Sequence, residues 1–291
     1  AKLQRTLFNV DPRGRQLKGW TNKLIWGDNK LILSSLKNGP LRQEIEEQGG
    51  IKLIYIDPPF DVGADFSMNI EIGDEEFTKK PNVLEELAYR DTWGKGADSF
   101  IAMIYERLSL MHDLLADDGS IYVHCDYRVN SYIRLTLDEL FGKDMFRNEI
   151  VWKKYSGVKN QASKKLTTQT DSIFWYSKSK DNFIFNQQYR AMSEEYVKGE
   201  YKYTDESGRR YAKIRGRGYQ GPTGEQNIKY LDENPGSPIT SLWDEGGLQL
   251  NTSSAERLEY PTQKPESLLE RIIKESSNEN DIVADFFMGS G

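Results

Sequence analysis

An acidic residue followed by two prolines and an aromatic ring, Asp57-Pro58-Pro59-Phe60, is the segment of this sequence best suited to chemistry. It follows the apolar run 53–56, which we expect to form a buried parallel strand, and open α/β sheets bind ligands at the carboxyl ends of such strands. Each proline lacks a backbone donor and forces its predecessor toward extended geometry. The result is a stiff rim with a carboxylate, free carbonyl groups and an aromatic face, which suits holding an exocyclic amine on a flat ring. An ordinary strand-ending turn would use the same residue types.

Three further groups could bind a ligand, and each also has a plainer explanation. Asp28 follows residues 24–27, which we expect to form a short strand, but taken on its own it is better explained as a helix N-cap. Lys264 precedes Pro265 and could be an exposed lysine at an expected helix start, although the helix dipole disfavours a cation there. Residues 285–291 run from a strand into a Gly-x-Gly turn that lets a ligand approach the backbone, as many βα turns also do.

Strand and helix patterns alternate along most of the chain and predict a mostly parallel sheet. After Ile150 the chain becomes basic, aromatic and glycine-rich, and 172–176 is the one convincing strand there. The expected elements are helices over 31–38, 101–115, 129–140 and 265–273, strands over 52–56, 120–125 and 282–286, and a long loop over 61–98.

Charge is distributed unevenly. The chain of 291 residues has a formal net charge of −6, but residues 147–229 contain 17 basic and 9 acidic side chains. This asymmetry predicts an acidic catalytic body with a basic segment facing nucleic acid, although a solvated charged loop would look similar. The lone Cys125 and the two histidines argue against an internal disulfide and a structural zinc site. Since no apolar run approaches membrane-spanning length, we expect a cytoplasmic protein without a membrane partner.

Taken in order, the motifs resemble those of the DNA amino-methyltransferases. They are Gly27-Asp28-Asn29, the tetrapeptide at 57–60, a variable basic segment, Thr262-Gln263-Lys264-Pro265 and Asp285-x-Phe287-x-Gly289-x-Gly291. Because the catalytic motif precedes the cofactor glycines, the chain resembles the permuted β group, which includes type III restriction-system modification subunits and solitary bacterial enzymes.

The resemblance implies a Rossmann-like, doubly wound α/β fold with a mostly parallel sheet and an inserted basic target-recognition region. The catalytic part would span 20–152, the target-recognition region 153–259, and a cofactor-binding part 260–291. The family continues with a further helix and strand, so we expect this last part to be cut short at its C-terminal end.

The resemblance also implies S-adenosylmethionine as cofactor, with no metal. The catalytic residues would be Asp57, Pro58, Pro59 and Phe60. The cofactor would be bound by Asp28, Lys264, Asp285, Phe287, Gly289 and Gly291. DNA phosphates or base edges would be contacted by Lys153, Lys154, Lys164, Lys165, Arg209, Arg210, Lys213, Arg215 and Arg217.

The implied reaction moves a methyl group to the exocyclic N6 of adenine in double-stranded DNA, after the base has flipped out of the duplex. The Asp57 carboxylate and the Pro58 carbonyl would each accept one N–H bond of the amine, and Phe60 would stack on the base. Cytosine N4 is a similar amine and remains an alternative, although family members that use it more often begin the tetrapeptide with serine. A second alternative is not an enzyme but a catalytically silent subunit that only recognises DNA. A methyltransferase acting on RNA or on protein glutamine is a weaker alternative. The sequence leaves open whether the chain pairs with itself or with a restriction subunit.

Overall fold

The computed structural model describes residues 21–59, 68–72, 75–79, 97–154, 164, 166–213, 228–250, 256–258 and 263–289. The chain divides into two compact units, one formed by Ala1–Ile184 with Trp243–Gly291 and the other by Phe185–Leu242. Within the described ranges, no helix is both long and apolar enough to cross a lipid bilayer.

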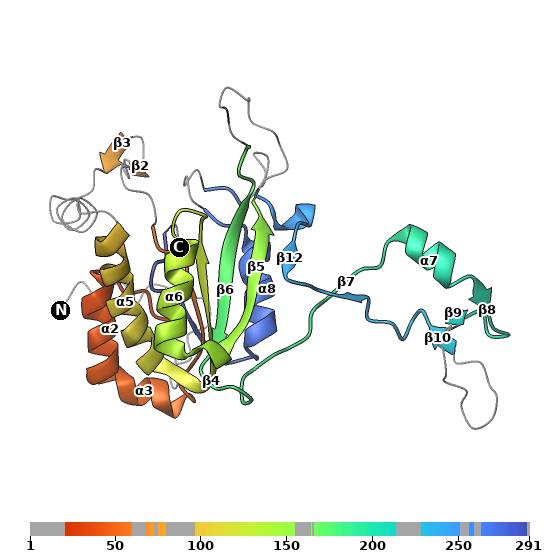
Figure 1. The fold of residues 1–291 in the computed structure, drawn as a ribbon, viewed down its shortest axis with the longest axis horizontal. Helices are drawn as coiled ribbons and strands as arrows, with labels where there is room; N and C mark the ends of the chain where they lie inside the picture. The colour runs from red at the N-terminus through yellow and green to blue at the C-terminus, as the bar shows by residue number, and fades with distance from the viewer. Residues whose placement is uncertain are drawn as a thin grey trace. The chain divides into compact units, whose positions relative to one another are not determined.

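The larger unit is built on a six-stranded sheet with the order β12-β5-β6-β4-β1-β13 (Figure 1). Strand β1, next to the edge strand β13, is parallel to both of its neighbours, β13 and β4, whereas β6 is antiparallel to β4 and β5. Four strands therefore run in one direction against β6, which confirms the predicted mostly parallel α/β sheet. The strands are β1 (Ile51–Ile56), β4 (Leu115–Cys125), β5 (Phe146–Lys153), β6 (Thr170–Ser177), β12 (Leu242–Trp243) and β13 (Ile282–Ala284).

Helices cover both faces of this sheet, as Figure 1 shows. Successive residues of β4 point to opposite faces of the sheet. On one face, Ile121 and Val123 join the core beneath α5 and α6. On the other face, the Tyr122 hydroxyl lies 2.8 Å from Ser276 Oγ of α8. The fold is thus doubly wound. The helices within its described residues are α2 (Asn29–Asn38), α3 (Leu41–Glu47), α5 (Ala97–Leu114), α6 (Asn130–Phe141) and α8 (Glu266–Ser276), with short 3₁₀ turns η1 (Lys143–Met145) and η2 (Gly246–Leu248).

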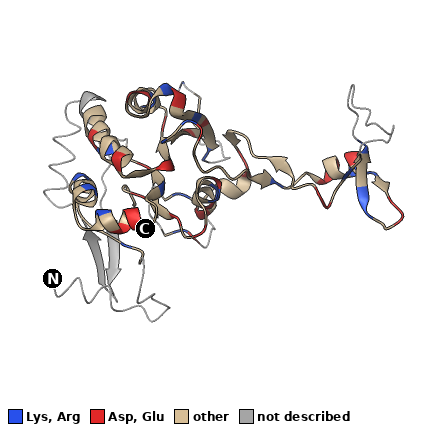
Figure 2. Cartoon of the chain, turned by 90° about the horizontal axis from the view of Figure 1, so that it is seen from below, with Lys and Arg blue, Asp and Glu red and all other residues tan. Residues whose placement is uncertain are grey.

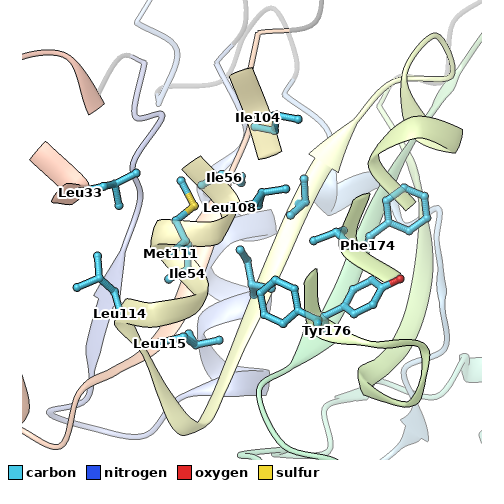
Figure 3. Packing of buried hydrophobic residues seen from close by; sticks show 14 of the residues in the cluster. Leu33, Ile54, Ile56, Ile104, Leu108, Met111, Leu114, Leu115, Phe174 and Tyr176 are labelled. Carbon is cyan, nitrogen blue, oxygen red and sulfur yellow. The ribbon is translucent and has the colours of Figure 1, made fainter. Parts of the chain in front are cut away.

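The main hydrophobic core lies between α5 and the sheet (Figure 3). Apolar residues three or four positions apart on α5 form one buried face, as their spacing predicts. They pack against alternate residues of the neighbouring strands. The contributors include Ile104, Leu108 and Met111 from α5, Ile54 and Ile56 from β1, and Phe174 and Tyr176 from β6.

Leu108→Ala should lower the free energy of unfolding by about 2–5 kcal/mol, because it removes a completely buried side chain and leaves a cavity. Leu135→Ala is the matched control, since Leu135 on α6 is 66% exposed and its truncation should cost less than about 0.5 kcal/mol. Urea unfolding followed by circular dichroism would compare the two. Equal effects would contradict the described core.

The expected strand over 24–27 is wrong, because this described segment is irregular and pairs with none of the described strands. Leu24 and Trp26 are 70% and 81% exposed. An apolar run becomes a strand only when a neighbouring strand satisfies its backbone groups. The helix that follows is found as predicted.

The expected long loop is also partly wrong. It contains an antiparallel hairpin of β2 (Met68–Ile72) and β3 (Glu75–Lys79). The sequence signal was the two-residue Gly73-Asp74 connection between alternating segments, which is typical of hairpins.

Sequence inspection also missed β5, and it placed β6 in the inserted region. Both strands belong to the central sheet, because residues 171–177 of β6 are buried and pair with β4 on one side and β5 on the other. The separate unit, Phe185–Leu242, is consequently shorter than the predicted region 153–259.

The described part of the smaller unit, which leaves out residues 214–227, contains two small sheets and one helix. Strands β8 (Tyr203–Thr204), β9 (Arg210–Lys213) and β10 (Ile228–Tyr230) form an antiparallel sheet in the order β10-β9-β8. β7 (Tyr189–Arg190) pairs with β11 (Ser237–Pro238), and α7 is Glu194–Glu200.

Candidate functional site

The candidate site lies at the carboxyl ends of two adjacent parallel strands. Asp57 follows β1 directly, and Asp285 follows β13 directly. The register aligns Ile54 with Ala284, so the two acidic residues come to the same edge of the sheet. The sequence predicted that both carboxylates lie at the ends of parallel strands, and open α/β sheets bind their ligands there.

The Asp57 carboxylate is held on one side by a lysine from a distant segment. Lys264 donates from Nζ to Asp57 Oδ2, and the two side chains are only 15% and 19% exposed. The other oxygen, Oδ1, is shielded from solvent and accepts no hydrogen bond from the part of the chain that the structure describes. A buried acceptor without a donor is unfavourable, so this oxygen is ready to accept a bond from a ligand. Its orientation is set by the ion pair at Oδ2.

Asp285 is coupled electrostatically to this pair. Its Oδ1 accepts a hydrogen bond of 2.8 Å from the backbone N–H of Phe287. Burial is the main cause that raises the pKa of Asp285 to about 6, and the negative charge of Asp57 raises it further. The hydrogen bond from the Phe287 N–H and the positive charge of Lys264 act in the opposite direction. The residue nevertheless keeps exposed surface, so solvent screens part of this effect.

Asp285→Asn should raise the midpoint of thermal unfolding at about pH 7.5 by about 1–2 °C, and by less at about pH 4. A carboxyl group whose pKa is raised in the folded protein favours folding while it is protonated, and this contribution is lost as the pH rises through its folded pKa of about 6. Replacing it with a neutral amide removes the penalty at high pH. Melting curves across this pH range would test it, with the exposed Glu279→Gln as control. A larger gain at low pH would contradict the expected sign.

The Asp28-Asn29 segment meets the turn after β13. Asp28 caps α2, because its Oδ1 accepts from the N–H groups of Lys30 and Leu31 at 2.9 and 3.1 Å. Asn29 Nδ2 donates to the backbone carbonyl of Phe286 at 3.0 Å. The plainer explanation of Asp28 as an N-cap is thus correct. Its contact with the cofactor stays a prediction, although the fold does bring it close to the Asp285 turn.

A buried polar chain, which sequence inspection missed, lies on the same face of the sheet as Asp57. The Tyr55 hydroxyl is 2.9 Å from His124 Nδ1, and His124 Nε2 is 3.4 Å from Asp171 Oδ2. Lys154 Nζ donates to Asp171 Oδ1 at 2.8 Å. The available signal was the position of Tyr55 two residues before Asp57, because such residues share one face of a strand. These hydrogen bonds connect the neighbouring strands that position Asp57.

Burial and nearby charges shift the pKa values of Tyr55 and Asp171, the residues on either side of His124, in opposite directions. Burial, reinforced by Asp57, Asp285 and Asp171, raises the pKa of Tyr55, so the hydroxyl remains protonated and able to donate. Burial also acts to raise the pKa of Asp171, but the hydrogen bonds from His124 and Lys154 outweigh it and lower the pKa. A neutral tyrosine and an ionised aspartate therefore flank His124.

Comparison with known proteins identifies the family. Residues 51–291 match the family model described as DNA methylase (N6_N4_Mtase). The chain belongs to the DNA methylase family. It is 28% identical to the type II methyltransferase M.EcaI of Enterobacter cloacae, over 93% of this chain and 62% of that protein. It is 24% identical to the StyLTI Mod subunit, a type III restriction-modification enzyme of Salmonella typhimurium, over 93% of this chain and 48% of that protein.

A solved structure with a similar arrangement is the M1.HpyAVI–SAM complex, at 19% identity and a TM-score of 0.44, covering 91% of this chain and 81% of that one. The chain spans about half to two thirds of the length of the curated relatives named above. The match to the family model confirms the resemblance to the DNA amino-methyltransferases at the level of the family.

The basic residues predicted to contact DNA fall into two groups. Three of them are already engaged within the protein. Lys154 pairs with Asp171, as described above. Arg209 binds Asp232 and Glu233, the shortest contact to each being 2.8 and 2.6 Å, and Arg210 donates to the carbonyls of Tyr201 and Val197 at 2.9 and 3.1 Å.

The remaining basic residues are either less constrained or cannot be placed. Lys213 is exposed, with its ammonium 4.5 Å from the centroid of the Tyr203 ring, and Lys164 is also exposed. Lys153 ends β5 and is partly exposed. Basic and acidic side chains are interspersed in the smaller unit (Figure 2). Phe60, Lys165, Arg215, Arg217 and Gly291 lie outside the described residues, whereas Phe287 and Gly289 lie in the turn after β13.

Proposed function

We propose that this chain forms the catalytic core of an S-adenosylmethionine-dependent methyltransferase that acts on the N6 amine of adenine in double-stranded DNA. The observation that carries the proposal is the Asp57 carboxylate, whose Oδ2 is paired with Lys264 while the shielded Oδ1 has no donor in the described part of the chain. An acceptor of this kind, followed by two prolines at the carboxyl end of a parallel strand, is suited to an exocyclic amine. Membership in the DNA methylase family supports the same chemistry.

The residues around Asp285 suit the proposed cofactor. S-adenosylmethionine would supply an electrophilic methyl group on a positively charged sulfur. The Asp285 carboxylate complements positive charge, and the turn that follows it offers backbone groups at residues 286–289. Asp28 lies beside this turn through its neighbour Asn29. We propose that Asp28, Asp285, Phe287 and Gly289 contact the cofactor. Lys264, which pairs with Asp57, and Gly291, which lies outside the described residues, stay predicted cofactor contacts.

Asp57 and Pro58 would orient the amine. Asp57 Oδ1 accepts one N–H bond and the Pro58 carbonyl accepts the other, which draws the nitrogen toward tetrahedral character and exposes its lone pair. Lys264 keeps Asp57 Oδ2 occupied, so that Oδ1 is the oxygen left to face the amine. The proton that the nitrogen loses would leave along the bond to Asp57. Most of the rate acceleration would come from this orientation.

Asp57 at the head of the tetrapeptide supports adenine over cytosine, because the cytosine-N4 enzymes of this family more often have serine there. Cytosine N4 remains the second candidate, since its amine could use the same two acceptors. The target base would have to leave the duplex to reach Asp57.

We also propose that the smaller unit, Phe185–Leu242, contributes to target recognition. Its exposed Lys213 and Lys202 lie at 4.5 and 5.6 Å from the Tyr203 ring, and aromatic and basic groups in combination suit nucleic acid. A second copy of the chain and a restriction subunit are further proposed partners, which sedimentation and co-purification would test.

The direct test is transfer of labelled methyl groups from S-adenosylmethionine to duplex DNA by the full chain, followed by digestion to nucleosides. N6-methyladenine is the expected product. N4-methylcytosine would support the second candidate, and DNA binding without any transfer would support a silent recognition subunit. RNA and protein acceptors, added as competitors, should not reduce the DNA label.

A further inference from the structure

Arg107 on α5 contacts the first residues of α2, which are the residues that meet the turn after β13. Its side chain is only 13% exposed. Nε donates to Asn29 Oδ1 at 2.5 Å, and Nη1 donates to the carbonyl of Met103 one helical turn earlier at 3.1 Å. Nη2 lies 3.6 Å from Asp28 Oδ2. One guanidinium group therefore connects α5 with both Asp28 and Asn29.

The bond from Arg107 determines how the Asn29 amide is oriented. Arginine has only donors, so Asn29 must present its oxygen to Arg107. Its amide nitrogen is then directed to the Phe286 carbonyl, to which it donates at 3.0 Å. The chain Arg107–Asn29–Phe286 thus fixes the backbone of the turn that follows β13, across a sequence separation of 257 residues between Asn29 and Phe286.

This turn needs external support, because β13 is only three residues long. Without Arg107, the Asn29 amide could rotate and release the Phe286 carbonyl, and the Asp28 carboxylate would lose its nearby cation. A binding site held in its bound shape has a higher affinity than one that must be ordered by its ligand.

We propose that Arg107 is a positioning residue. It holds Asp28, Asn29 and the turn after β13 in the arrangement that binds S-adenosylmethionine. This rests on the proposed function. Arg107 itself acts through Asn29 and Asp28.

The test is the dissociation constant of S-adenosylmethionine, measured by titration calorimetry on the full chain and on Arg107→Met. We expect about tenfold weaker binding in the variant, because a hydrogen bond to a charged group is lost. Arg107→Lys should be intermediate, since lysine keeps the charge but cannot make the forked contacts. Where turnover is measured, the KM for the cofactor should rise while kcat stays within about twofold.

The matched control is Glu106→Gln. Glu106 is the neighbouring residue on α5, and it pairs with Lys30 on α2 at 2.7 Å, with both side chains about half exposed. This variant breaks a contact between the same two helices without touching Asn29. Its affinity for the cofactor should remain within about twofold of the wild type.

Asn29→Asp tests the same hydrogen-bond chain, Arg107–Asn29–Phe286, without removing Arg107. Aspartate keeps an acceptor for Arg107 but has no N–H for the Phe286 carbonyl, so binding should again weaken about tenfold. Thermal unfolding without cofactor would check that each variant is folded. If the wild type binds the cofactor and both Arg107→Met and Asn29→Asp bind equally well, the inference is overturned. A folded wild type that binds no cofactor would instead overturn the proposed function, and this inference with it.

Discussion

Asp57→Ala should reduce methyl transfer to DNA by about 10³-fold while leaving the affinities for DNA and S-adenosylmethionine within about twofold. The substitution removes the shielded Oδ1, which we propose accepts an N–H bond of the target amine. This interaction orients the nitrogen in the transition state and contributes little to binding of the whole substrate. Asp57→Asn should be less severe, at about 10²-fold, because the amide retains one acceptor but loses the charge.

Single-turnover assays with the full chain and duplex DNA would measure this effect. Asp144→Asn is a suitable control, because Asp144 is a 73% exposed carboxylate that pairs with Lys180 at 3.2 Å away from β1. It should retain wild-type activity. Asp57→Ala with undiminished transfer would refute the proposed mechanism, and an equal loss in Asp144→Asn would point to a general effect of charge.

Lys264→Met should lower the free energy of unfolding by about 1–3 kcal/mol, and it should slow methyl transfer by about 10–100-fold. It leaves the mostly buried Asp57 carboxylate without its cation, and it frees Oδ2 so that Oδ1 is no longer held in position. The loss of stability should be smaller than for a completely buried ion pair, because each side chain retains some exposure. Lys264→Arg should recover part of both losses.

A double-mutant cycle separates the ion pair from the other contacts of Lys264. The combined Asp57→Asn/Lys264→Met variant should be more stable than the sum of the two single effects predicts, since neither charge is then left unpaired. Urea unfolding of the four proteins would give the coupling energy. Strict additivity would mean that the two side chains do not stabilise each other in solution.

Local pattern alone located the residues around Asp57. The apolar run before it could be recognised as β1, because a strand buried on both faces is continuously apolar. The helical faces of α5 and α8 followed from the spacing of their apolar residues. The position of Asp57 and Asp285 at strand ends was therefore predictable from the sequence. The prediction of a strand over 24–27 was wrong because a strand needs a neighbouring strand to pair with, and the local sequence pattern does not show whether one is present.

Only the tertiary structure decided which of these residues meet. The contact between Lys264 and Asp57 spans 207 positions, and that between Asn29 and Phe286 spans 257. The first arises because α8, which begins just after Lys264, packs against β1, and the second involves the turn after β13, the strand beside β1. The sequence singled out Lys264, but it gave no indication that this side chain pairs with the Asp57 carboxylate. His124 and Arg107 carried no signal of their own, because a histidine in a buried strand and an arginine on a helix acquire their roles from neighbours that the fold supplies.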